Sequence, residues 1–327
     1  MASMKDDFEE YRKPTYDSLL NSYMSEELAL FIGAGVSRVA GCLSWHELGK
    51  RLIEECYKYI DEGKRLINYQ EKENLINKLN SRDLISYANL IFFKNSGKED
   101  NFYLKLKELL SQPNDDSIYE TIDKLDVPYI TTNADTIFDK FLKKENIVIE
   151  NFGSIFDENL TNYPKGLQKK HLYKIHGSIC KTETLVFTTS QYLERYNEEN
   201  FQNFLKKVFQ EYNVLFIGYG LNEFELLEYM FKKINEDENN ETSNAKQIKE
   251  HYFIKGYFKY EKNLLELDRT HFYDNFKIKI LPYPLDEDGY DGIKKILEEL
   301  IDYIHSRQLA SNLNKIDEIV NEIDKKT

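Results

Sequence analysis

Cysteine is scarce in this chain of 327 residues, and long apolar runs are missing. The three cysteines, Cys42, Cys56 and Cys180, share no CxxC spacing, so they form neither a disulfide framework nor a four-thiolate zinc site. No apolar stretch approaches the length that spans a bilayer, and residues 1–10 are charged rather than signal-like. We therefore expect a soluble, cytoplasmic protein without a metal and without a membrane contact.

Positive charge is also in short supply. The 57 acidic residues outnumber the 44 lysines and arginines, which gives a formal net charge of −13. This balance argues against a broad phosphate-backbone footprint, so we expect no direct contact with nucleic acid. Hydrophobic residues make up 41% of the chain and aromatic residues 14%, which is typical of a globular protein with a substantial core.

Several short apolar runs predict buried parallel strands, because strands covered on both faces read as continuous hydrophobic runs. Four of them end in a small or polar cluster: residues 28–32 before GAGVS, 127–132 before NAD, 172–175 before HGS and 214–217 before GYG. Weaker runs predict further strands at residues 147–152, 185–189, 252–254 and 276–281.

Segments with helical apolar spacing lie between these runs. Ser44 and Glu47 fit a capping box that opens a helix at about Trp45. Residues 66–112 lack alternation, and we interpret them as an insertion of two or three helices. Further helices are predicted at residues 6–25, where Pro14 could cause a break, after Asp135, at 191–212, after Gly220 and at 290–304, with an exposed polar loop at 235–247. Strands that alternate with helices predict an α/β domain with a largely parallel sheet flanked by helices.

The four polar clusters would meet at one edge of this sheet, where open α/β folds bind their ligands. Glycines at that edge let the backbone turn and approach a phosphate. Each cluster also has a structural explanation. Asn133 and Asp135 could cap the next helix, His176 could be a satisfied structural residue, and Gly218 could belong to a simple turn. Their coincidence at four strand ends favours a binding site.

The glycine motif does not fit a dehydrogenase. Arg38 stands where the dinucleotide fingerprint has its third glycine. About twenty residues further on, Glu54 and Glu55 lie within a predicted helix rather than at the end of a second strand. The chain therefore lacks the pattern of a hydride-transfer cofactor site.

The ordered motifs GAGVS, the glycine and tryptophan of GCLSW, TTNAD, KIHG and FIGYG resemble the sirtuin-like family over about residues 28–227. They are most similar to its bacterial defence-associated branch, whose members hydrolyse NAD⁺. The resemblance implies a Rossmann-like sheet with an inserted all-helical module. The four zinc-binding cysteines of sirtuin deacylases have no counterpart, and Leu43-Ser44-Trp45 replaces their aspartate-phenylalanine-arginine. We therefore expect no zinc ribbon, and both departures argue against protein deacylation.

The resemblance also implies roles for individual residues. His176 would be the catalytic base, and we expect an ordinary pKa for it. Asn133 would hold the nicotinamide ribose or the attacking water, and Asp135 would hydrogen-bond the nicotinamide carboxamide. The implied NAD⁺-binding residues are Gly33, Ala34, Gly35 and Ser37 at the phosphates and ribose, Gly218 and Tyr219 at the adenosine half, and Trp45, Thr132 and Gly220.

The implied activity is hydrolysis of the nicotinamide–ribose bond, with NAD⁺ as substrate, water as acceptor, and nicotinamide and ADP-ribose as products. Such an enzyme would be an abortive-infection effector of antiphage defence, kept off until triggered. The implied partners are further copies of the chain, a HerA-type ATPase or a short Argonaute module. The alternatives are a module that binds NAD⁺ or a related nucleotide without turnover and, with less support, a deacylase.

We divide the chain into three parts on this basis. Residues 1–27 form an N-terminal helical extension, and residues 28–307 form the sirtuin-like NAD-hydrolase domain, with the helical insertion at about 62–115. Residues 308–327 form a C-terminal helical tail. Its apolar stripe, which includes Leu309 and Leu313, could pack on the domain or on a partner.

Overall fold

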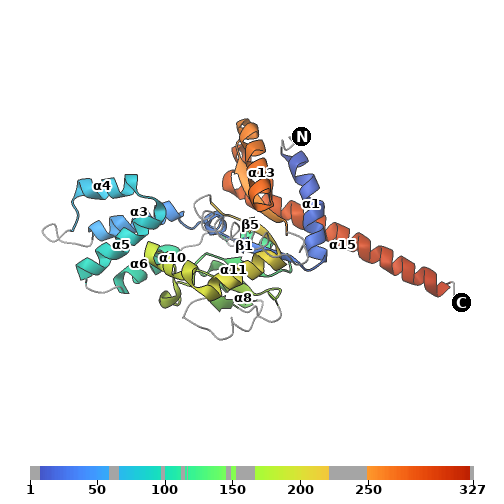
Figure 1. Ribbon diagram of the computed structural model, residues 1–327, viewed down its shortest axis with the longest axis horizontal. Coiled ribbons are helices and arrows are strands. Elements are labelled where there is room, and N and C mark those ends of the chain that lie inside the picture. The colour runs from blue at the N-terminus through green and yellow to red at the C-terminus, as the bar shows by residue number, and fades with distance from the viewer. Residues whose placement is uncertain are drawn as a thin grey trace, which may run out of the picture.

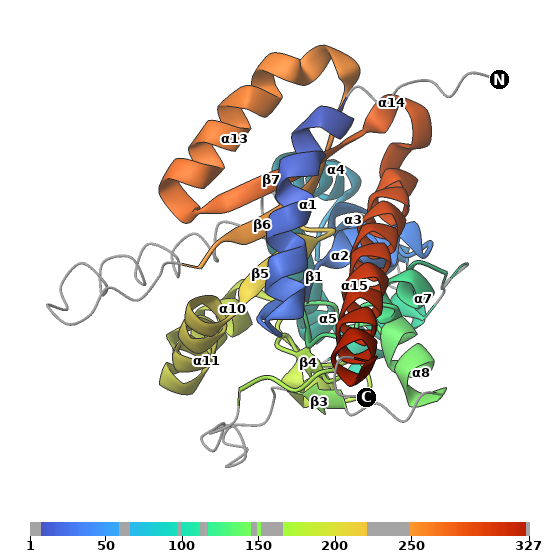
Figure 2. The same cartoon turned by 90° about the vertical axis from the view of Figure 1, so that its right-hand side faces the viewer.

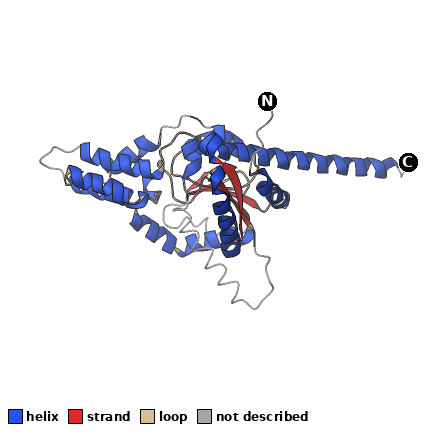
Figure 3. Ribbon diagram, turned by 90° about the horizontal axis from the view of Figure 1, so that it is seen from above, coloured by secondary structure: helices blue, strands red, loops and turns tan. Residues whose placement is uncertain are grey.

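One parallel sheet organises the protein. The computed structural model describes residues 8–58, 66–96, 100–111, 115, 117–144, 149–151, 166–220 and 249–324. Seven strands pair in the order β3-β4-β2-β1-β5-β6-β7, and every pair is parallel. They are β1 (Leu28–Ile32), β2 (Tyr129–Thr131), β3 (Ile149–Asn151), β4 (Leu172–Lys174), β5 (Asn213–Ile217), β6 (His251–Tyr257) and β7 (Ile278–Pro284). Helices flank the sheet (Figure 3), which confirms the Rossmann-like α/β fold.

Strand β1 lies at the centre of the sheet and is buried along its whole length. It pairs with β2 on one side and with β5 on the other. Leu30 and Ile32 point into one hydrophobic cluster, whereas Phe31 points into the cluster on the opposite face. A strand with two buried faces needs an apolar residue at every position, which explains the continuous run LALFI.

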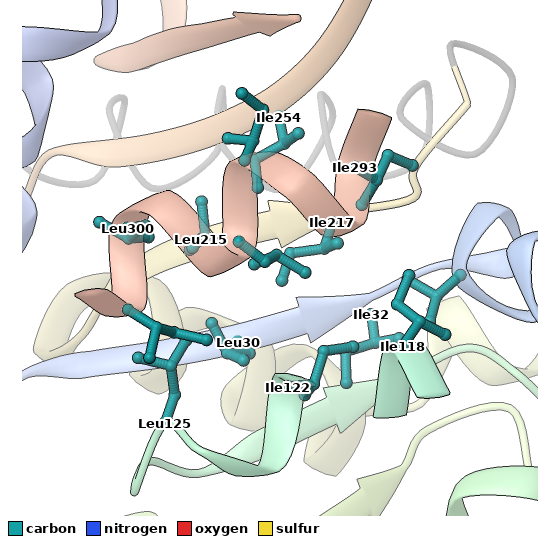
Figure 4. Close-up of a cluster of buried hydrophobic side chains, with 14 of the residues drawn as sticks. Leu30, Ile32, Ile118, Ile122, Leu125, Leu215, Ile217, Ile254, Ile293 and Leu300 are labelled. Carbon is teal, nitrogen blue, oxygen red and sulfur yellow. The ribbon is translucent and has the colours of Figure 1, made fainter. Parts of the chain in front are cut away.

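Among the described residues, five helices cover the first face of the sheet. They are α1 (Glu9–Met24), α2 (Ala34–Val39), α7 (Ser117–Asp123), α8 (Ile137–Lys144) and α15 (Gly292–Asp324). Ile293 and Leu300 of α15 and Ile118 of α7 pack over Leu30 and Ile32 (Figure 4). Burying each such side chain contributes about 1.5–3 kcal/mol. Figure 2 shows α1 beside α15 on this face.

The opposite face is covered by α11 (Glu199–Glu211) and α13 (Lys262–Phe276), with α10 (Thr189–Asn197) preceding α11. Its core is rich in aromatic rings. Phe31 lies 5.1 Å from Tyr219 and 5.4 Å from Phe216, centroid to centroid. The short elements are α14 (Leu285–Asp288), η2 (Thr182–Thr184), η3 (Lys259–Glu261) and η4 (Gly289–Asp291).

A separate helical module lies at one end of the molecule (Figure 1). It consists of α3 (Trp45–Lys58), α4 (Tyr69–Lys78), α5 (Ser81–Ser96) and α6 (Asp100–Leu110). The expected capping box is present, since Glu47 N–H donates to Ser44 Oγ at 3.2 Å. The module has its own hydrophobic core, which also includes Ala134 and Phe187 from the loops beyond β2 and β4. The module therefore packs against the edge of the sheet where the site was predicted.

Two predicted elements were wrong. Residues 185–187 form no strand, although they are buried in the core of the helical module. This run is buried by side chains of the helical module rather than by a neighbouring strand. Thr188 follows it and caps α10 by accepting a hydrogen bond from Gln191 N–H. The helix predicted over residues 191–212 is divided into α10 and α11 at Glu198, whose backbone is extended. Helix α1, in contrast, continues through Pro14.

Other elements were absent from the prediction or extend beyond it. Helices α2, α7 and α13 were not predicted. The closing helix predicted at residues 290–304 is the first part of α15, which continues to Asp324 and projects away from the body (Figure 1). Leu309 and Leu313 on its projecting part are exposed. The helix expected after Gly220 and the polar loop at 235–247 fall outside the described residues.

Candidate active site

The ends of β1 and β5 are joined backbone to backbone. Gly33 N–H donates to Ile217 O at 2.8 Å, and Gly35 N–H donates to Gly218 O at 2.7 Å. A Cβ on Gly35 would lie 2.7 Å from Gly218 O. Gly218 has a φ of +67°, and a Cβ there would lie 2.5 Å from the nitrogen of Val36. The glycines therefore permit this close approach, and the N–H groups of Gly33 and Gly35 serve the fold rather than a phosphate.

A buried polar cluster links the ends of β1 and β2. Asn133 Nδ2 donates to Gly33 O at 3.0 Å and to Ser37 Oγ at 2.9 Å. Ser37 Oγ donates in turn to Asp135 Oδ2 at 2.6 Å. Asp135 Oδ1 accepts from Ile137 N–H at 3.0 Å and caps α8. Asp135 thus has a structural role in addition to its place in the cluster.

Two tyrosines extend this cluster. Tyr119 OH lies 3.0 Å from Ser37 Oγ, and burial holds the pKa of Tyr119 well above its usual range. Thr132 Oγ1 lies 3.1 Å from Tyr219 OH, which connects β2 with the end of β5. The sequence prediction missed Tyr119, because a tyrosine near two isoleucines in a short helix is indistinguishable from an ordinary core residue.

A buried ion pair holds the loop that contains Asp135. Lys174, at the end of β4, donates to Asp135 O at 2.5 Å and to Asp139 Oδ1 at 2.8 Å. The side chains of Lys174 and Asp139 are 1% and 8% exposed. Lys174 therefore ties β4 to α8 and holds the backbone of Asp135. In the sequence, Lys174 stands two residues before His176 in the motif KIHG, but only the histidine was assigned a role.

His176 follows β4 and lies among aromatic rings of α10. Its Nε2 is 3.1 Å from Tyr196 OH, and its ring packs edge-on against Tyr192 and Tyr196 at 5.0 and 5.9 Å. Burial, together with the positive charges of Arg195 and Arg82, lowers the pKa of His176 to about 3. The expectation of an ordinary pKa was therefore wrong, and His176 is neutral in this conformation. The i, i+3, i+4 spacing of Tyr192, Arg195 and Tyr196 placed them on one helix face, but nothing in the sequence pointed that face at His176.

A small cavity lies between the polar cluster and the helical module. Its free volume is about 30 Å³, which is room for about one or two water molecules. Among its lining residues are Ala34, Ser37, Trp45, Asn133, Asp135 and Phe187. The rings of Trp45 and Phe187 lie 5.0 Å apart and form its apolar wall.

The structure therefore brings Ala34, Ser37, Trp45, Asn133 and Asp135 to one cavity. Other predicted residues lie close by without lining it. Strands β2 and β4 are adjacent, with Ile175 N–H donating to Thr131 O at 2.9 Å, so His176 and Asn133 follow neighbouring strand ends. Gly220 is exposed, and a Cβ there would meet nothing within 4 Å.

Two polar atoms at the cavity residues lack a hydrogen-bond partner in the described part of the chain. They are Asn133 Oδ1 and Trp45 Nε1, and both are buried. His176 Nδ1, which α10 covers, is likewise buried without a hydrogen-bond partner among the described residues. Buried polar atoms are nearly always satisfied in native proteins, so each of these requires an explanation.

The described ranges contain neither a candidate metal-binding cluster nor a helix able to span a membrane. There, no three or more His, Cys, Asp or Glu side chains are grouped so that they could hold a metal ion. Cys42 lies in the cavity wall, and burial together with the nearby Asp135 raises the pKa of its thiol to about 12. Within the same ranges, no helix combines the length and apolar character needed to cross a bilayer.

Comparison with known proteins finds a family that part of the chain resembles. Residues 127–271, which include β2, Asn133, His176 and Gly218, match the SIR2-like domain family. This part of the chain is therefore similar to a SIR2-like domain, in agreement with the resemblance of the motifs.

Three curated proteins are similar in sequence to this chain, at modest identity. NAD(+) hydrolase ThsA of Acinetobacter baumannii (strain 532279) is 25% identical over 230 residues, covering 69% of this chain and 43% of that protein. NAD(+) hydrolase ThsA of Cytobacillus dafuensis is 26% identical over 318 residues, covering 89% and 56%. Defense-associated sirtuin 2 of Bacillus subtilis is 23% identical over 318 residues, covering 93% and 28%. The chain thus spans between about a quarter and about half the length of these relatives.

Proposed function

We propose that this chain is an NAD⁺ glycohydrolase, which cleaves the nicotinamide–ribose bond and releases nicotinamide and ADP-ribose. The observation that carries the proposal is the buried cluster of Ser37, Asn133 and Asp135, together with the position of His176 after β4, the strand that neighbours β2. The names of the two NAD(+) hydrolase relatives support the same activity.

The reaction suits a site built from hydrogen bonds and one carboxylate. Cleavage of the nicotinamide–ribose bond develops oxocarbenium character on the ribose, so charge stabilisation and orientation matter more than a strong nucleophile. In this proposal the carboxylate of Asp135 lies near that developing positive charge. Asn133, fixed by Gly33 and Ser37, orients the ribose or the attacking water.

His176 takes a proton from the attacking water. Its imidazole is neutral, as a base must be, but a pKa of about 3 makes it a weak base in the conformation described. Moving Tyr192 and Tyr196 away would let water reach the ring and return the pKa towards its usual range, where general-base catalysis is efficient. Catalysis therefore requires a displacement of α10.

We infer that the described conformation is a resting state. A cavity of about 30 Å³ cannot take a nicotinamide ring, so Trp45 and Phe187 must separate before NAD⁺ binds. Such control fits an abortive-infection effector of antiphage defence in the cytoplasm, where unregulated NAD⁺ hydrolysis would harm the host. The trigger would act through self-assembly or through a partner chain such as a HerA-type ATPase or a short Argonaute module.

The proposal is tested by comparing the wild-type chain with His176→Ala under conditions in which the wild type consumes NAD⁺. We expect kcat to fall by roughly 10²- to 10⁴-fold, as for loss of a general base, with the unfolding midpoint retained. An equal rate of nicotinamide release in the variant would remove His176 from the mechanism. Calorimetric binding of NAD⁺ without nicotinamide release in the wild type, with its partner present, would replace the hydrolase by a binding module.

A further inference from the structure

Ser37, in α2, is the junction of the buried polar cluster. Its Oγ lies 2.9 Å from Asn133 Nδ2, 2.6 Å from Asp135 Oδ2 and 3.0 Å from Tyr119 OH. A serine hydroxyl has one proton to donate and two lone pairs that accept. Three neighbours therefore use the whole capacity of Ser37, and their chemistry fixes the direction of each hydrogen bond.

The carboxamide of Asn133 has one orientation that suits its neighbours. Its Nδ2 lies 3.0 Å from Gly33 O, and a carbonyl oxygen can only accept a hydrogen bond. Turning the amide over would place Oδ1 against this oxygen and leave two acceptors without a proton between them. The NH₂ group therefore faces Gly33 and Ser37, so Ser37 accepts a hydrogen bond from Asn133.

The proton of Ser37 goes to Asp135. The carboxylate of Asp135 accepts this bond at 2.6 Å, which uses the one proton that Ser37 has. Tyr119 must then donate its own proton to the remaining lone pair of Ser37. Burial holds the pKa of Tyr119 well above its usual range, so the hydroxyl keeps this proton near neutral pH. The hydrogen bonds thus run in one direction, from Tyr119 to Ser37 and from Ser37 to Asp135.

Packing also holds Tyr119 in this position. Tyr119 lies on α7 and is 1% exposed, and its ring stacks on Phe138 of α8 at 4.8 Å with an interplanar angle of 22°. Ser37 and Asp135 are among the described residues that line the cavity, and Tyr119 is not. Tyr119 therefore acts on a ligand in the cavity through Ser37.

We propose that Tyr119 is a positioning residue for the reaction. Its hydroxyl orients Ser37, and Ser37 holds the carboxylate of Asp135 near the positive charge that develops on the ribose. This role rests on the proposed function, whereas the direction of the hydrogen bonds follows from the structure alone. Because hydrogen bonds in a chain polarise one another, the Tyr119 proton also strengthens the bond between Ser37 and Asp135. Ser37 has no capacity left for the NAD⁺ phosphates or ribose, so its part is to connect Tyr119 with Asp135.

Steady-state kinetics of Tyr119→Phe test this role under conditions in which the wild type consumes NAD⁺. The substitution removes the hydroxyl and keeps the ring that stacks on Phe138. We expect kcat to fall by roughly 3- to 10-fold, as for one hydrogen bond, with KM unchanged, because Tyr119 does not contact the substrate. In the Ser37→Ala background, which already lacks the connection, adding Tyr119→Phe causes no further fall in kcat.

Tyr129→Phe is the matched control. Tyr129 is fully buried and packs edge-on against the same Phe138 ring at 5.2 Å, but its hydroxyl donates to Leu125 O at 2.7 Å, outside the polar cluster. We expect this variant to lose as much stability as Tyr119→Phe and to keep the kcat of the wild type. An unchanged kcat in Tyr119→Phe, a rise in its KM alone, or an equal fall of kcat in the two variants would overturn the positioning role and leave the hydrolase intact.

The positioning role and the hydrolase can fail separately. Urea unfolding of the wild type, Tyr119→Phe, Ser37→Ala and the double variant measures the hydrogen bond without any turnover. We expect the double variant to lose less unfolding free energy than the two single losses combined, because both substitutions remove the same bond. Additive losses would overturn the connection between Tyr119 and Ser37. If the wild type released no nicotinamide with its partner present, the hydrolase would be overturned, and the role of Tyr119 in it, even where unfolding shows the hydrogen bond.

Discussion

Two neighbouring strand ends hold their functional side chains in opposite ways. After β2, Asn133 and Asp135 are fixed by polar partners that leave little freedom. After β4, His176 is surrounded by the rings of Tyr192 and Tyr196, and its Nε2 lies 3.1 Å from Tyr196 OH. In the proposed hydrolase, the polar side chains after β2 are already held in place, although the cavity beside them must open, whereas His176 must first be uncovered by a movement of α10.

The largest effect on stability is expected for the Lys174–Asp139 ion pair, which holds the loop after β2. Lys174→Met leaves Asp139 buried without its cationic partner, which costs about 3–5 kcal/mol of unfolding free energy. The measurement is urea unfolding. The matched control is Lys174→Met combined with Asp139→Leu, which removes both charges and should recover most of the loss. If Lys174→Met were as stable as the wild type, the Lys174–Asp139 ion pair would not stabilise the loop after β2.

The glycine contact between β1 and β5 gives the next largest effect. Gly218→Ala introduces a Cβ at a φ of +67° and 2.5 Å from Val36 N, so we expect a loss of about 1–3 kcal/mol. Thermal unfolding measures it. Gly220→Ala is the control, because a Cβ there meets nothing within 4 Å. Equal midpoints for the two variants would contradict the tight contact.

The buried histidines make stability depend on pH. The pKa of His176 and that of His251 are both lowered to about 3 by burial. Below pH 6.5 the unfolded chain therefore binds protons that the native chain does not. Their contribution to stability is complete above pH 6.5 and is lost as the pH falls towards 3, at about 1.4 kcal/mol per pH unit for each histidine.

Urea unfolding at several pH values between 6.5 and 5 measures this slope. His251→Asn is informative, because an amide oxygen can replace His251 Nδ1 as the acceptor for Val214 N–H but does not titrate. We expect about half of the slope to remain in this variant, from His176. A slope unchanged by the substitution would contradict the burial of a neutral His251.

The smallest effect is expected for the contact between Tyr196 of α10 and His176. Tyr196→Phe removes the hydroxyl 3.1 Å from Nε2 but keeps the ring, at a cost of about 0.5–1.5 kcal/mol. Because this contact holds α10 over His176, we expect resting NAD⁺ hydrolysis to rise by roughly 2- to 10-fold. Tyr257→Phe is the control, because Tyr257 lies on β6 and loses its hydrogen bond to Asp268 of α13; it lowers stability without raising the rate. A lower rate in Tyr196→Phe would instead make the hydroxyl part of the catalytic machinery.

The sheet and the β2 end of the site could be predicted from sequence, because buried strands are continuous apolar runs and polar residues directly follow them. The same rule failed at residues 185–187, where an apolar run is buried by helices rather than by strands. Helix α13 was missed because only Leu265, Phe272 and Phe276 of its residues are buried. The low pKa of His176 was unpredictable, since it depends on a helix that begins thirteen residues later and folds back over it.

The central claim is that this sheet edge hydrolyses NAD⁺, and product analysis tests it most directly. The full chain is incubated with NAD⁺ in ¹⁸O-labelled water, with and without its partner, and the products are separated by mass. The account predicts nicotinamide and ADP-ribose in equal amounts, with one labelled oxygen in the ADP-ribose. NAD⁺ that stays intact, or ADP-ribose found only on an acyl or protein acceptor, would contradict it.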